Sequence, residues 1–137
     1  MLDSWVIYGG KQIKDSALAK AAADAFLLPS ENVKIYKDIK SINKKTKIYI
    51  KAQKRIQSSE NFYFQFIITF DSSIFSDDAE PDKSGFNDAT MRIARKLAPC
   101  LGIPLIGSLS DFNRNDIYYY KCYPDGREER VEWPEED

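Results

Sequence analysis

Hydrophobic and polar residues alternate along much of the chain, with the period of two that indicates half-buried β-strands. The strongest such pattern covers residues 62–70, where four phenylalanines and one isoleucine fall on a single parity. Because one face of this strand is so rich in aromatic rings, we expect it to lie under the helices. The same pattern predicts further strands at 5–8, 33–40 and 47–53, and a final hairpin over 117–133.

Two other segments have apolar residues at helical spacing. The first has its apolar face over residues 18–26 and is predicted to end before Pro29. It is rich in alanine, which lets a helix lie close to a sheet. The second points Ile93 and Leu97 inward and is predicted to kink or stop near Pro99, with Gly102 beyond its end.

The predicted order of elements is β-α-β-β-β-α-β-β, and 137 residues suit a single domain over 1–137. Two helices on one face of a mainly antiparallel sheet make an α+β sandwich of two layers. A ferredoxin-like core with extra strands is compatible with this order.

The composition narrows the cellular setting. The formal net charge is −1, which gives no overall attraction to nucleic acid or to a membrane. No apolar run is long enough to cross a bilayer, and the first residues lack the basic and apolar regions of a signal peptide. We therefore expect a cytoplasmic protein that makes no membrane contact.

The chain has no histidine and two cysteines, Cys100 and Cys122. The lack of histidine excludes histidine-based general-base catalysis, Ser-His and Cys-His nucleophile pairs, and histidine metal ligands. Two cysteines fit small buried residues in a reducing compartment better than a disulfide framework. No cofactor and no metal site are predicted, and the protein is expected not to be an enzyme.

A basic stretch over residues 34–55 holds nine lysine and arginine residues. On the predicted strands, Tyr36 shares parity with lysines, and Tyr49 shares parity with Lys47 and Lys51. Paired as a hairpin, these strands would present a lysine-rich face with tyrosines, which suits phosphate contacts and base stacking. The same pattern is compatible with an anionic protein partner, or with a solvated face whose lysines guard the sheet edges.

Acidic residues gather in two other places. Residues 71–88 are predicted to form a long loop, in which Asp77, Asp78 and Glu80 could dock on a basic partner or remain in solvent. Their spacing is not that of a calcium-binding loop, so no metal is expected there. Residues 134–137 add an acidic tail.

The final hairpin is predicted to turn at Pro124-Asp125-Gly126. We expect the parity of Cys122 to be buried, and with it Tyr118 and Tyr120. Tyrosine, tryptophan and arginine are enriched at protein interfaces, although cross-strand aromatic packing explains the same pattern. The residues expected to remain available to a partner are Tyr119, Tyr123, Arg127 and Arg130.

Residues 88–133 contain a helix with the sequence Met-Arg-Ile-Ala-Arg-Lys-Leu-Ala, a short apolar link over 102–106, an aromatic strand, a Pro-Asp-Gly turn and a last charged strand. In this order of elements the segment resembles small bacterial polymorphic-toxin immunity proteins. The resemblance covers about a third of the chain and carries over no residue roles. It implies a catalytically inert protein that binds and blocks a toxin through charged surfaces.

The leading hypothesis is therefore a non-catalytic cytoplasmic binding protein, similar to an immunity protein or antitoxin, that blocks a charged protein partner such as a toxin domain. The separation of basic and acidic segments favours steering toward a charged partner. One alternative is a nucleic-acid-binding module that uses the lysine-rich hairpin over 34–55. A third is an enzyme that depends on carboxylates.

Overall fold

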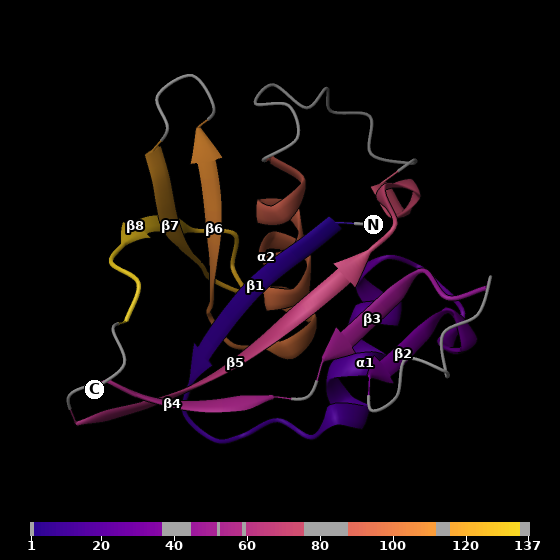
Figure 1. Cartoon of the computed structure of the whole chain (residues 1–137), viewed down its shortest axis with the longest axis horizontal. Coiled ribbons are helices and arrows are strands. Elements are labelled where there is room, and N and C mark those ends of the chain that lie inside the picture. Colours follow the sequence, from indigo (N-terminus) through magenta and orange to yellow (C-terminus); the bar gives the residue numbers. More distant parts are fainter. Residues whose placement is uncertain are drawn as a thin grey trace.

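The computed structural model describes residues 2–36, 45–51, 53–58, 60–75, 88–111 and 116–134. These residues form eight strands, two α-helices and two short 3-10 helices (Figure 1). In chain order the elements are β1 (Leu2–Gly9), α1 (Asp15–Ala25), η1 (Ser30–Asn32), β2 (Val33–Tyr36), β3 (Ile48–Lys51), β4 (Lys54–Ser58), β5 (Asn61–Phe70), η3 (Ser72–Phe75), α2 (Asp88–Leu101), β6 (Leu105–Asp111), β7 (Asp116–Cys122) and β8 (Glu128–Val131).

The predicted α+β class is confirmed, and the helices and strands follow one another in the predicted order. Two strands are additional to the prediction. β4 follows β3 after a short break, and β6 begins at Leu105, inside the segment that was interpreted as an apolar link. Both are easy to miss because basic residues dilute the apolar pattern of β4, and small and polar residues that of β6.

The sheet has the order β2-β3-β5-β1-β6-β7-β8, with β4 also paired to β5. Its central strands β6-β1-β5-β3 pair antiparallel, with α1 after β1 and α2 between β5 and β6. This arrangement is the ferredoxin-like one that the order of elements suggested. The remaining strands extend that core at both edges.

β2 and β3 pair in parallel, with Val33 opposite Ile48 and Tyr36 opposite Lys51. The predicted hairpin over 34–55 is therefore wrong. Two parallel strands cannot be joined by a tight turn, because the second strand starts at the same end of the sheet as the first. The antiparallel partner of β3 is β5.

The hydrophobic core lies between the sheet and the two helices, which contact one another on the same side of the sheet (Figure 1). Tyr8 of β1 lies opposite Phe64 of β5, and their ring centroids are 5.5 Å apart. As expected, alternate residues of β5 point into this core, where Phe66 and Phe70 are fully buried. Only Phe62, near the start of the strand, is exposed on that parity.

α2 packs closely on β6 because the strand carries a glycine at the contact. A Cβ atom at Gly107 would lie 3.2 Å from the Cβ of Ala94 on α2. The helix continues through Pro99 to Leu101, so Pro99 does not stop it, and it ends before Gly102 as predicted. Gly102 has a φ of 70° and donates its N–H to the carbonyl of Ala98 at 2.8 Å.

A polar cluster closes the core beside the break between β3 and β4. The buried Tyr8 hydroxyl accepts the N–H of Ile13 at 2.9 Å and donates to the side chain of Gln53. The Gln53 amide donates in turn to the Ile13 carbonyl and to Asp15. Burial raises the pKa of Tyr8, so the hydroxyl keeps its proton and the cluster ties the segment after β1 to the sheet.

Candidate functional site: an aromatic groove

The sheet face opposite the helices carries an open groove. Four side chains surround it: Trp5 of β1, Gln65 of β5, Tyr119 of β7, and Trp133, which follows β8. These residues are far apart in the sequence, and the strand order brings them together because β5, β1, β6 and β7 are consecutive in the sheet. We call this site the aromatic groove.

The groove has two lobes that share those four residues. The larger lobe has a volume of about 610 Å³ and is completed by Lys54, Ile56, Glu132 and Pro134. The smaller lobe has a volume of about 310 Å³ and is completed by Ser108 and Ile117. One lobe therefore carries charge of both signs, and the other is mostly apolar.

The side chains that line the smaller lobe are only partly covered. Trp5 is 46% exposed and Ile117 is 58% exposed. The ring centroids of Tyr119 and Trp133 lie 4.8 Å apart, with the ring planes inclined at 42°. Tyr119 also lies opposite Val131 across β7 and β8. Because Trp133 follows Val131 by two residues, this register brings the Trp133 ring against the Tyr119 ring.

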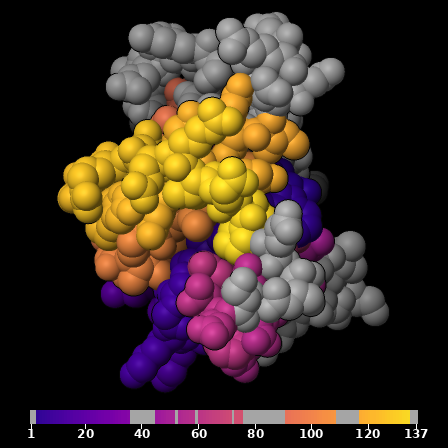
Figure 2. Space-filling view, turned by 90° about the vertical axis from the view of Figure 1, so that its left-hand side faces the viewer, coloured from indigo at the N-terminus to yellow at the C-terminus, as the bar shows by residue number. Residues whose placement is uncertain are grey.

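Figure 2 shows the β7–β8 hairpin, in yellow, above the β4–β5 hairpin, in magenta, on the side where the groove's charged lobe lies. Lys54 and Ile56 come from β4, while Glu132 and Pro134 come from the segment after β8. The two hairpins thus supply opposite walls of this lobe.

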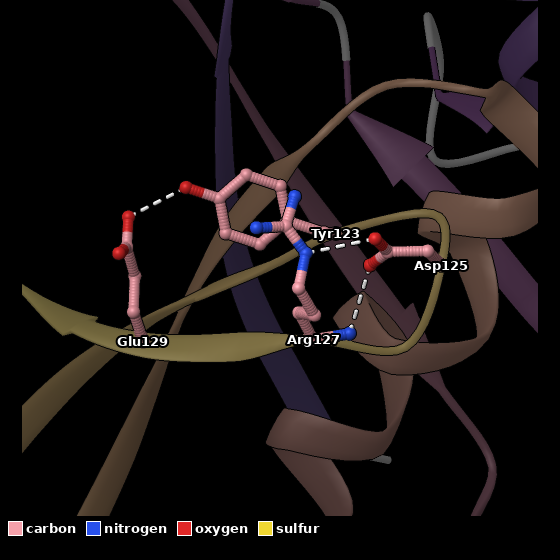
Figure 3. Close-up of polar contacts among 4 residues, drawn as sticks. All are labelled: Tyr123, Asp125, Arg127 and Glu129. Atoms are coloured by element: carbon pink, nitrogen blue, oxygen red, sulfur yellow. Dashed lines mark hydrogen bonds and ion pairs between the residues drawn. The ribbon is translucent and has the colours of Figure 1, made fainter.

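The tip of the β7–β8 hairpin holds a compact polar cluster (Figure 3). Tyr123 donates its hydroxyl proton to Glu129 at 2.6 Å, and the guanidinium of Arg127 lies 4.4 Å from the centre of the Tyr123 ring. Asp125 accepts the backbone N–H of Arg127 at 3.0 Å and its side-chain Nε at 2.8 Å. Gly126 closes the predicted turn with a φ of 94°.

Two pKa shifts follow from this cluster. The hydrogen bond to the Glu129 carboxylate raises the pKa of Tyr123, because it favours the protonated hydroxyl. The backbone N–H and the side chain of Arg127 lower the pKa of Asp125. The cluster is accessible to solvent, so it shapes the hairpin tip rather than a reactive centre.

The predicted parities of the hairpin are largely as expected. Cys122 is buried, and Tyr120 packs against the core. Tyr118 is only partly buried, and the guanidinium of Arg130 lies 4.2 Å from its ring centre. On the other parity, Tyr119 lines the aromatic groove while Tyr123 lies at the tip, so the structure separates two residues that the sequence grouped together.

The parallel pairing of β2 and β3 places three residues of the predicted basic face, Lys34, Tyr49 and Lys51, on one side of the sheet. Lys51 is exposed, but Lys47 lies 3.8 Å from the carboxylate of Asp71. Tyr49 is 9% exposed, so its predicted exposure is wrong. The reason is that β3 is flanked on both sides: Tyr49 lies opposite Lys34 of β2 and Thr69 of β5.

Several predicted positions cannot be placed relative to the groove. Asp77, Asp78 and Glu80 lie outside the described residues, as do most of the predicted acidic loop over 71–88 and the last three residues of the tail. Tyr36 is described only by its backbone, at the end of β2. Within the described ranges, no group of three or more cysteine, aspartate or glutamate residues could hold a metal ion.

Sequence reasoning missed Trp5, Gln65 and Ile117 as site residues. Their parity was available, because Trp5 alternates with Val6 and Tyr8, which both face the core. The missing information was which strands are neighbours.

The cysteines offer a direct test of the hairpin's packing. Burial, with the Glu128 carboxylate as a second cause, raises the pKa of Cys122 to about 11. Cys100 is exposed near the end of α2, so the expectation of two buried cysteines is wrong for Cys100. We expect a thiol reagent at mildly alkaline pH to modify Cys100 rapidly and Cys122 at least about 100-fold more slowly, because the thiolate is the reactive form. Mass spectrometry of digested protein measures both rates, and Cys100→Ser serves as the control. Equal rates in the folded protein would contradict the described packing.

No helix in the described part of the chain is long and apolar enough to span a membrane. In comparisons with known proteins, no family model, no curated protein and no solved structure matches the chain.

Proposed function

We propose that the protein is a non-catalytic binding protein that engages a protein partner through the aromatic groove. One observation carries the proposal: Trp5, Tyr119 and Trp133 surround an open hollow on the sheet face that no described helix covers. Tryptophan and tyrosine dominate the energetics of protein interfaces, since they bury a large area at little cost in side-chain entropy. Contiguous exposed apolar surface of this kind is typical of interaction sites.

The resemblance of residues 88–133 to immunity proteins suggests that the protein partner is a toxin domain. Tyr119 and Trp133 lie in that segment, and they supply two of the rings. The protein would then act in the bacterial cytoplasm by covering a functional surface of a toxin domain. Such a role requires tight binding and no chemistry from this chain.

Nucleic acid is a less suitable occupant of the groove. The predicted hairpin that motivated this alternative is replaced by a parallel pair of strands.

Site-specific photo-crosslinking tests the proposal. A benzophenone amino acid would replace Ile117, which is 58% exposed in the groove, or Leu27, which is 87% exposed just after α1. In cells of the source organism, we expect Ile117 to capture one defined protein and Leu27 to capture none. Capture of nucleic acid, or equal capture of the same protein from both positions, would refute binding through the groove.

A further inference from the structure

We infer that the aromatic groove takes an extended acidic segment of the partner, with one apolar side chain of that segment held between the rings. The inference rests on the proposed function and adds the chemistry of the occupant. It depends on three features of the groove: an apolar lobe, a glutamine amide that makes no hydrogen bond with the described residues, and a basic edge.

The smaller lobe is suited to one apolar side chain. Ile117 and the rings of Trp5, Tyr119 and Trp133 surround it, and Ser108 is the polar residue that completes its wall together with Gln65. Its volume of about 310 Å³ is open to solvent and sufficient for a side chain that enters from a partner. Filling it would remove the exposed surface of Trp5 and Ile117 from water, which favours binding.

The side chain of Gln65 lines both lobes, between the apolar lobe and the charged one. Among the described residues, its amide makes no hydrogen bond. A glutamine amide offers two donor hydrogens and an acceptor oxygen, which match the carbonyl and N–H groups of an extended backbone. An extended segment would therefore gain hydrogen bonds at the point where it passes from one lobe to the other.

Charge complementarity favours a negatively charged segment. Lys54 reaches the groove from β4, opposite Gln65, and Lys51 lies just before it on β3. Carboxylates of a partner would lie along this basic edge, while Glu132 on the far wall keeps them on the β4 side.

A library of short random peptides displayed on phage tests the inference without knowledge of the partner. We expect selection on the folded protein to enrich peptides that combine several acidic residues with one large apolar residue. Synthetic versions of these peptides would then be titrated by fluorescence anisotropy against the wild-type protein and against the double variant Lys51→Glu, Lys54→Glu. Both lysines are exposed strand residues, so the variant is expected to fold.

The expected result is at least a tenfold loss of affinity in the double variant, and recovery when the acidic residues of the peptide are changed to lysine. Truncation of the apolar residue of the peptide should lower the affinity by a similar factor. The variant Trp5→Ala should lower the affinity for the intact peptide by a similar factor as well. Enrichment of basic or uncharged peptides, no enrichment at all, or affinity that ignores the charge reversal would overturn the inference. Binding of an oligosaccharide array through Trp5 and Gln65, in place of peptides, would overturn it as well.

The two proposals fail in different ways. Crosslinking of a protein from position 117, combined with peptides that are insensitive to charge, would refute only the acidic segment. A crosslink to nucleic acid at that position would refute the protein partner itself.

Discussion

Phe70→Ala is expected to lower the free energy of unfolding by about 3–5 kcal/mol, since the change deletes a whole ring from a closed core. Phe70 is 0% exposed and lies opposite both Leu2 of β1 and Ile48 of β3. Its ring also meets the edge of Phe75, with centroids 5.6 Å apart. The cavity would form beside β1, β3 and η3, which all border the Phe70 position. These three elements would have to move to fill it. Urea unfolding followed by circular dichroism measures the loss.

Phe62→Ala is the matched control. Phe62 lies on the same strand and the same parity, but it is 42% exposed and its ring is covered by the guanidinium of Arg55 at 3.8 Å. We expect a loss of about 1 kcal/mol or less, because little buried area and one surface cation–π contact disappear. Similar losses for both variants would contradict the position of the core under the Phe70 end of β5.

Residues 62–70 show how much of the fold the sequence could predict. Alternation reports the two faces of a strand directly, so the core-facing parity of β5 was correct for every residue except the exposed Phe62. Alternation does not report how far the helices extend along that face. Phe62 lies near one end of β5, beyond the buried run, and is therefore exposed despite its parity.

Tyr49 shows a second limit. Its parity placed it on the face away from the helices, and that assignment agrees with its position opposite Thr69. Its exposure was wrong because a residue in a central strand has neighbours on both sides, and here these are Lys34 and Thr69. The neighbours of β3 depend on the parallel return from β2, and the polar connection over 43–46 is equally compatible with a hairpin.

The aromatic groove could not be predicted from the sequence for a related reason. Tyr119 could be proposed from its own hairpin, since Trp133 follows the opposite strand a few residues later. Trp5 and Gln65 join these rings only because β1 and β5 lie at the centre of the sheet, between β3 and β6. Non-local strand order is the information that a period-two pattern lacks.

Trp5→Ala is expected to weaken binding of the partner captured from position 117 by about 2 kcal/mol or more, which corresponds to about 30-fold in Kd. Trp5 lines both lobes of the groove and is 46% exposed in the free protein, so its ring is available for burial against a partner. The loss should appear mainly as faster dissociation, because the removed contacts are short-range. Surface plasmon resonance with the purified partner measures it.

Phe62→Ala again provides the comparison, since Phe62 has a similar exposure, 42%, but lies outside the groove. We expect its affinity for the partner to stay within about twofold of the wild type, as is usual for residues away from a hot spot. Unfolding measurements on both variants separate lost binding from lost structure. If Trp5→Ala folds normally and binds as tightly as Phe62→Ala, the groove is not the energetic centre of the interface, and the contact must be sought elsewhere on the molecule.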